Sequence, residues 1–259
     1  MVRRMSLRAV LVLALVAGVA APDAAEARDR KASKASVSKR AKAKKASRKK
    51  RVSRVPSAKT IANVKNMPRG YAWPPSAQML AAEEACAEAL TAAEVQFAPA
   101  RREGRIVSAL TIVPADDGSI TLGGVTYRSA FRRGPHKLDC QLALALVRFG
   151  QDLAATGVRE VKFGSIFRWT NVRVNGETKP FLSRHALGIA MDIVSFVDDT
   201  GREANVKRDY PQGDPLLLAV ESAVNQSGTF RTLLTPRNDP ASHSDHFHLE
   251  VAVDYTAAP

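Results

Sequence analysis

Four of the five histidines in this chain lie in two short blocks whose spacing suits metal chemistry. They are His185, which is followed seven residues later by Asp192, and the cluster of His243, His246 and His248. Imidazole and carboxylate groups are the ligands of catalytic zinc sites, in which three protein ligands leave a fourth position for water. The two blocks therefore predict a zinc site, which is the strongest functional signal in the sequence.

Alternation along a predicted strand over residues 246–253 places the late histidines on one face. His246, His248 and Glu250 share that face, and the intervening residues are apolar and suit a core. The alternative interpretation is that these are surface or hydrogen-bonded histidines on edge strands. We disfavour it because apolar strands rarely carry several polar groups on one face.

A second predicted strand, residues 188–196, carries the carboxylate of the site. Asp192 shares its face with small neighbours, which leaves room for a metal or a substrate. His185 lies on the connection that enters this strand, where a loop could bend it back toward Asp192.

The remaining pattern predicts an α+β domain, in which a small, mainly antiparallel sheet is flanked by helices. Ser76 and Asp214 are suitable N-caps, and Pro215 suits a first helical position. We expect helices over residues 76–97, 139–155 and 214–225, and strands within 106–131 and over 160–169, 188–196, 230–234 and 246–253.

Residues 1–27 are typical of a secretory signal peptide. Arg3, Arg4 and Arg8 precede an apolar run at residues 9–21, and residues 25–27 form an Ala-Glu-Ala cleavage site. The apolar run is shorter than the ~20 residues of a membrane-spanning helix, so we expect no stable membrane span. A short membrane anchor is the alternative. The expected location is the periplasm or the outside of the cell.

Residues 28–66 form a predicted disordered tail rich in Lys, Arg, Ala and Ser. Residues 28–59 hold 15 Lys or Arg and one acid, which matches the chain's formal net charge of +14, whereas residues 60–259 hold 21 basic and 22 acidic side chains. Such a tail could bind nucleic-acid phosphates or anionic polymers of the cell envelope. The export signal favours envelope polymers over nucleic acid. A solvated linker with no partner is the remaining alternative.

Cys86 and Cys140 are the two cysteines of the chain. In an oxidising compartment an even pair favours a disulfide, and the alternative is two buried free thiols. A zinc role is disfavoured because neither cysteine lies near the histidine blocks.

A resemblance to known zinc peptidases is carried by S-x-H-x-x-G-x-A-x-D at residues 183–192 and H-x-H at residues 246–248. The pattern resembles the D-alanyl-D-alanine carboxypeptidase and dipeptidase superfamily, which is shared with penicillin-insensitive murein endopeptidases. Within it, the chain is most similar to the bacterial extensin-like C-terminal domain family, whose end resembles residues 230–236 leading into the H-x-H. The resemblance covers roughly residues 67–255.

The resemblance implies a D-Ala-D-Ala carboxypeptidase-like, metallopeptidase-like domain over residues 67–259. It also implies zinc (Zn²⁺) bound by His185, Asp192 and His248. The metal would lower the pKa of its water and polarise a peptide carbonyl.

The same resemblance implies roles for neighbouring side chains. His246 is favoured as the base that takes a proton from the water, and Asp245 is the second candidate. Arg168 matches an arginine that faces the substrate and could stabilise an oxyanion or hold a carboxylate, although an ordinary surface arginine is the alternative. Ser183 and His243 are candidate substrate-binding residues, and either could instead orient a metal ligand. An ordinary loop histidine is a further alternative for His243.

These observations predict an exported zinc-dependent peptidase that acts on peptidoglycan peptides through metal-activated water. The alternative from another class is a non-catalytic cell-envelope or peptidoglycan-binding protein with a vestigial metal site. A third class, a nucleic-acid-binding protein acting through residues 28–59, is disfavoured by the export signal.

Overall fold

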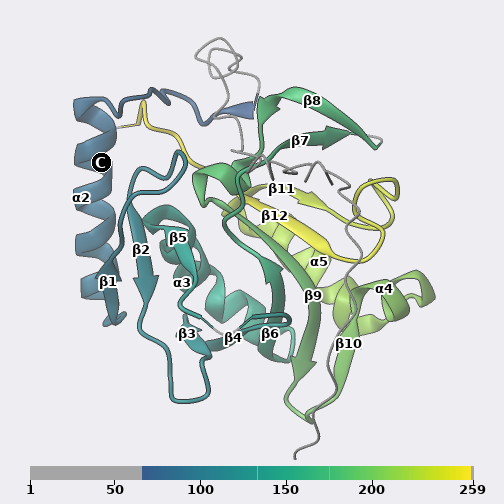
Figure 1. Cartoon of the computed structure of the whole chain (residues 1–259). Helices are drawn as coiled ribbons and strands as arrows, with labels where there is room; N and C mark the ends of the chain where they lie inside the picture. Colours follow the sequence, from purple (N-terminus) through teal and green to yellow (C-terminus); the bar gives the residue numbers. More distant parts are fainter. Residues whose placement is uncertain (1–65, 133, 175, 258–259) are drawn as a thin grey trace, which may run out of the picture. The chain divides into compact units, whose positions relative to one another are not determined.

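The computed structural model describes residues 66–257 apart from 133 and 175 (Figure 1). The predicted signal peptide and the predicted tail as far as residue 65 lie outside the described residues. The helices are α2 (Ala77–Ala92), α3 (Cys140–Ala155), α4 (Val206–Asp209) and α5 (Pro215–Ser227), with 3-10 turns η2 (Arg184–Leu187) and η3 (Tyr210–Gln212). The strands are β1 (Phe97–Pro99), β2 (Ala109–Ile112), β3 (Ile120–Leu122), β4 (Val125–Ser129), β5 (Lys137–Asp139), β6 (Val158–Ser165), β7 (Asn171–Val174), β8 (Glu177–Leu182), β9 (Ala190–Asp198), β10 (Glu203–Asn205), β11 (Phe230–Leu234) and β12 (Phe247–Val251).

A mainly antiparallel central sheet carries the predicted metal ligands. Its strands lie in the order β11-β12-β9-β6-β4-β3, and β10 also pairs with β9. Strands β4 and β6 are parallel, and the other pairs of this sheet are antiparallel. A three-stranded sheet, β1-β2-β5, and a two-stranded hairpin, β7-β8, complete the described part. The predicted α+β class with a mainly antiparallel sheet and flanking helices is confirmed.

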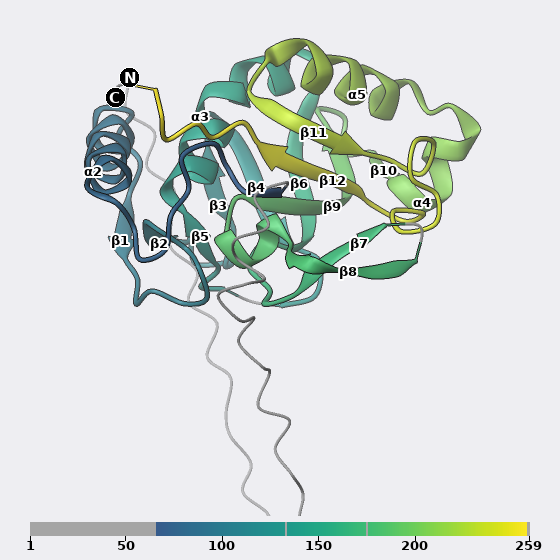
Figure 2. The same ribbon diagram turned by 90° about the horizontal axis from the view of Figure 1, so that it is seen from above.

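One face of the central sheet is buried beneath α3 and α5, whereas the β7-β8 hairpin lies on the other side (Figure 2). Met191 and Ile193 of β9, and Phe247 and Leu249 of β12, belong to the same core cluster as the buried side chains of both helices. Fully burying an aliphatic or aromatic side chain contributes roughly 1.5–3 kcal/mol. Because successive side chains of a strand alternate, the polar residues between these positions face the hairpin side.

The N-terminal ends of α3 and α5 are set by aspartate residues that cap them. Asp139 caps α3 by accepting a hydrogen bond from the Gln141 amide, and its other oxygen accepts from the amides of Val107 and Ser108. Asp214 caps α5, which starts at Pro215 as predicted. Each cap satisfies amides that the first turn of a helix leaves unpaired.

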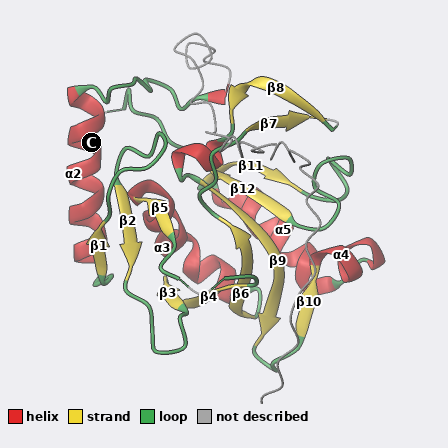
Figure 3. Ribbon diagram, in the orientation of Figure 1, coloured by secondary structure: helices red, strands yellow, loops and turns green. Residues whose placement is uncertain are grey.

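Several predicted boundaries differ from those observed (Figure 3). The helix predicted to reach residue 97 ends at Ala92, because Glu94 adopts a positive φ of 57° and ends the helical path. The predicted strand 188–196 begins at Ala190 and continues to Asp198, and the last strand begins at Phe247 rather than at residue 246.

The β7-β8 hairpin was not predicted, although the sequence contains a signal for it. Residues 175–176 are Asn-Gly, the pair that two-residue hairpin turns favour because both turn positions need a positive φ. The alternation before this turn, Asn-Val-Arg-Val, is only four residues long, and the Glu-Thr-Lys run that opens β8 is polar, so neither segment gives a strong strand signal. This hairpin forms one wall of the site described below.

The predicted cysteine pairing is confirmed, because Cys86 of α2 and Cys140 of α3 form a disulfide. The bond ties the N-terminal helix to the helix that packs on the central sheet. A disulfide is typical of proteins in an oxidising, non-cytoplasmic compartment. Among residues 66–257, no helix has the length and apolar character needed to span a membrane.

Removing this cross-link should destabilise the domain. The bond closes a loop with a sequence separation of 54 residues, for which the chain-entropy model gives about 4 kcal/mol of stabilisation. We expect Cys86→Ala/Cys140→Ala to lower the free energy of unfolding by that order in urea titrations. Reduced wild type is the matched control, and a loss below about 1 kcal/mol would contradict the expectation.

Candidate metal centre

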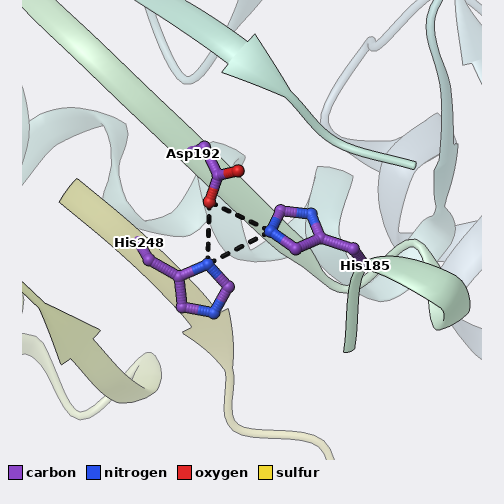
Figure 4. A group of neighbouring side chains, drawn as sticks. All are labelled: His185, Asp192 and His248. Carbon is purple, nitrogen blue, oxygen red and sulfur yellow. Dashed lines mark hydrogen bonds and ion pairs between the residues drawn. The ribbon is translucent and has the colours of Figure 1, made fainter. Parts of the chain in front are cut away.

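His185, Asp192 and His248 converge on one point (Figure 4). His185 Nε2 lies 3.0 Å from Asp192 Oδ1, His248 Nδ1 lies 2.8 Å from the same oxygen, and the two nitrogens are 3.1 Å apart. Donors around a tetrahedral zinc ion at ~2.0–2.1 Å lie about 3.3 Å from one another. Small shifts would therefore place all three atoms around one ion. This buried group could hold a metal ion.

His185 is positioned by the short turn η2. The Ser183 hydroxyl caps this turn by accepting from the His185 amide, and Gly188 ends it with a left-handed φ of 70°. The Ile166 carbonyl accepts a hydrogen bond from His185 Nδ1 at 2.6 Å. Because a carbonyl only accepts, Nδ1 carries a hydrogen, and Nε2 is the nitrogen that faces Asp192 and is available to a metal.

Asp192 uses its two carboxylate oxygens for different purposes. Oδ1 faces the histidine nitrogens, whereas Oδ2 accepts from the Ser165 hydroxyl at 2.8 Å and pairs with the Arg168 guanidinium at 2.9 Å. The carboxylate is thereby oriented by groups on its outer side, which leaves one oxygen for a metal. Asp192 also stands opposite His248 in the register of β9 and β12, so strand pairing alone brings two of the three groups together.

His248 is held from its other ring nitrogen by a buried carboxylate. Its Nε2 donates to Glu250 Oε1 at 3.2 Å, so that Nδ1 is the nitrogen directed at the site. Glu250 in turn pairs with Arg231 at 3.2 Å and lies 3.6 Å from Arg184. The Arg184 side chain is only 2% exposed and also donates to the carbonyls of Asn66 and Val251. The two arginines hold the Glu250 carboxylate in place, and Glu250 in turn fixes the orientation of the His248 ring.

The protonation states of the three groups follow from burial and mutual contact. Burial lowers the pKa of His185, which keeps this imidazole neutral. Burial alone would raise the pKa of Asp192, but contacts with His185 and His248 hold it well below its usual range. Burial likewise opposes charge on His248, but its bonds to Asp192 and Glu250 outweigh burial and raise its pKa to about 9. Metal binding would therefore release a proton from His248.

Two further histidines of the late block lie beside this triad, each paired with an aspartate. His246 Nδ1 lies 2.7 Å from Asp245 Oδ1, and its Nε2 is buried, 3.5 Å from Asp192 Oδ1, without a hydrogen-bond partner among the described residues. His243 Nδ1 lies 2.9 Å from Asp239 Oδ2. Burial and the nearby His248 lower the pKa of His243 to about 4, so this ring is neutral.

A groove of about 230 Å³ opens onto the triad. It is lined by Arg168 and His246, which were predicted to be catalytic, and by Ser183 and His243, which were predicted to bind substrate. Asp245, the second candidate base, is not among the groove-lining residues, and its side chain is 57% exposed. The Arg168 side chain is half exposed although one of its nitrogens pairs with Asp192. The other groove-lining residues are Thr170, Asn171, Val172, Arg173, His185, Leu234, Ala241, Ser242, His248 and Glu250.

Sequence reasoning assigned no role to three contributors to the site. Ser165 and Arg184 gave no signal, because their contacts join segments that are far apart in the sequence. Glu250 could have been found, since it follows His248 on the same face of one strand and a buried acid there suits the distal nitrogen of a metal-binding histidine.

Comparison with known proteins identifies one family. The family described as "Extensin-like protein C-terminus" matches residues 84–257, which is more than half of the 259-residue chain and includes all three residues of the triad. No curated protein and no solved structure matches the chain. The expected relation to zinc carboxypeptidases therefore stays a prediction.

Weakening the carboxylate behind His248 should weaken metal binding. Glu250→Gln keeps an acceptor for Nε2 but removes the negative charge, and loss of such outer partners typically costs about 10–100-fold in metal affinity. We expect a rise of that order in the zinc dissociation constant, measured by competition with a chelating dye. Glu160→Gln, which removes another arginine-paired acid of the central sheet, is the control. Equal affinities in both variants would refute the role of Glu250.

Proposed function

The chain belongs to the extensin-like protein C-terminus family, and from this premise we propose that it is an exported zinc-dependent peptidase acting on peptidoglycan peptides. One observation carries the proposal. Two imidazole nitrogens and one carboxylate oxygen converge beside a groove of about 230 Å³, and both histidines line that groove. Similarity of the two motifs to zinc peptidases supports the same reaction class.

The donor set fits zinc. Two histidines and one carboxylate are a known ligand set of catalytic zinc sites, and such sites leave one position for water. His185, Asp192 and His248 would hold the ion. A bound zinc ion would lower the pKa of its water molecule and polarise a peptide carbonyl.

His246 is suited to accept a proton at Nε2. The Asp245 carboxylate accepts a hydrogen bond from Nδ1, so a ring with a single hydrogen would carry it there and leave the Nε2 lone pair to accept a proton. That nitrogen is buried beside Asp192 and has no other partner among the described residues. An aspartate that orients a histidine base is a recurring arrangement in hydrolases. Asp245 thus acts through His246 in this proposal, rather than as the base itself.

Arg168 is suited to stabilise negative charge on the substrate. One guanidinium nitrogen pairs with Asp192, and the half-exposed remainder lines the groove. Arginine donors could bind a developing oxyanion or a substrate carboxylate. Ser183 orients His185 through its cap, and His243 offers a neutral ring to the groove, where it could accept a hydrogen bond from a substrate amide.

Export and envelope binding complete the proposal. The signal-like residues 1–27 and the basic residues 28–59 suit an exported protein that is tethered to anionic envelope polymers. The Cys86–Cys140 disulfide is compatible with this compartment.

Two of the site histidines should affect activity differently, His185 by binding zinc and His246 by accepting a proton. In a zymogram on purified sacculi, we expect His185→Ala to lose both zinc and activity. His246→Gln should keep zinc but lose about 10²–10⁴-fold in rate, the usual contribution of a general base. His136→Gln, which alters the one histidine outside both blocks, should behave as wild type.

The outcomes separate the proposal from its alternative. If zinc-loaded wild type and His185→Ala are equally inactive on sacculi and on soluble stem peptides, the peptidase proposal fails. Zinc binding with retention of muropeptides but no cleavage would instead select a non-catalytic envelope-binding protein.

The basic tail should contribute binding and not chemistry. Deleting residues 28–59 should reduce sedimentation of the protein with sacculi at low salt, and the difference should vanish as salt screens the charges. Rates on a soluble stem peptide should not change. Retention that is insensitive to both deletion and salt would contradict the tether, and salt-sensitive DNA binding lost on deletion would favour nucleic acid as the partner.

A further inference from the structure

We propose that the free edge of β7 binds the substrate as an added strand, and that the occupant is an extended peptide carrying a carboxylate. The inference rests on the proposed function, because it names how a peptide would lie in the same groove. It is carried by the way β7 lines that groove, by the direction of its backbone groups and by the charge of the groove wall.

Strand β7 borders the groove along its edge and not along its face. Residues 170–173 are consecutive in the sequence, and all four line the groove. A strand presenting one face would contribute alternate residues, because its side chains point to opposite sides in turn. Three consecutive lining residues of β7, directly preceded by Thr170, therefore indicate that the strand's edge, with its backbone, faces the groove.

The backbone of that edge has groups free for pairing. Within the described residues, β7 pairs with β8 and with no other strand. The Thr170 carbonyl accepts from the Ser183 amide on the β8 side. The β7–β8 register has an irregularity between Asn171 and Arg173, and the Asn171 carbonyl accepts a hydrogen bond from the Thr170 hydroxyl at 3.3 Å. From the alternation along an antiparallel strand, we infer that the amides of Asn171 and Arg173 and the Arg173 carbonyl point away from β8, toward the groove. An extended peptide could pair with these groups, as in other cases of strand addition to a sheet edge.

The groove joins this edge to the metal centre. Arg168 and Ser183, which flank the start and end of the hairpin, line the same groove as His185 and His248. At about 3.3 Å per residue, β7 gives a peptide some three residues of pairing. A strand bound there would extend past the triad, so the pairing would set the register of the bond to be cut.

Charge on the groove wall selects an acidic peptide. Arg168 and Arg173 line the groove, and Arg173 forms no ion pair among the described residues, its bond being to the Gly176 carbonyl. The one acid that lines the groove is Glu250, which is buried and already paired with Arg231. Arg168 already pairs with Asp192 of the triad, so a substrate carboxylate beyond the reacting bond would meet the Arg173 guanidinium, which has no acidic partner among the described residues.

The test compares matched variants of the edge. Asn171→Pro removes the outward amide, and proline is tolerated where a strand's amide faces away from its partner. Asn171→Ala removes the same side chain but keeps the amide. We expect the proline variant to bind a fluorescein-labelled stem peptide, L-Ala-γ-D-Glu-L-Lys-D-Ala-D-Ala, about ten-fold more weakly than the alanine variant. Binding is measured by fluorescence anisotropy in a zinc-loaded His246→Gln background, which keeps the peptide intact.

A second pair tests the charge. Arg173→Gln should weaken binding several-fold, whereas Lys179→Gln, on the neighbouring strand and not lining the groove, should leave it unchanged. Peptides amidated at the C-terminus or at D-Glu identify the carboxylate, because amidation at the one that Arg173 binds removes the difference between Arg173→Gln and its parent.

Equal binding by the proline and alanine variants, or no binding by their parent, would overturn the inference. Absence of cleavage in wild type, with binding still lost in the proline variant, would sink the peptidase proposal and leave the β7 site standing. The two failures are therefore distinguishable.

Discussion

One buried carboxylate, that of Asp192, is the group on which the site depends. Its Oδ1 lies within 3.0 Å of ligand nitrogens on both His185 and His248, and its Oδ2 is held by Ser165 and Arg168. Taking an ion out of water costs several kcal/mol unless neighbouring groups compensate it. These neighbours compensate the charge and at the same time fix the direction in which a lone pair points. A similar arrangement holds the other ring nitrogen of His248, where the negative charge of Glu250 is compensated by Arg184 and Arg231.

The scaffold makes this concentration of polar groups possible by separating the two faces of the central sheet. The apolar side chains of β9 and β12 at positions 191, 193, 247 and 249 pack in the core. Because side chains alternate along a strand, Asp192 and His248 must then point to the opposite face of the sheet. Two ligands stand on adjacent rigid strands, and the third stands on a turn fixed by Ser183 and Gly188. Sites supported by packed elements hold their geometry better than sites on loops. The groove wall, by contrast, comes from the two-stranded hairpin and the segment before β12.

The sequence predicts those features that depend on local periodicity and spacing. Alternation separates His248 and Glu250 from Phe247 and Leu249, and this separation appears in β12. The three predicted ligands do meet, but which partners hold them is a matter of tertiary contact. Ser165 reaches Asp192 from β6, 27 residues away in the sequence, and Arg184 reaches the Asn66 carbonyl across 118. No local pattern encodes such pairings. The early end of α2 escaped prediction for a related reason, because the positive φ of Glu94 occurs at a residue type that seldom adopts it.

The convergence of three side chains on a single cation is tested most directly by X-ray absorption spectroscopy at the zinc edge, on purified protein loaded with one equivalent of zinc. We predict nitrogen and oxygen neighbours at ~2.0–2.2 Å from the zinc ion, with the outer-shell scattering of two imidazoles. A shell of oxygen alone, or a signal with fewer than two imidazoles, would contradict it.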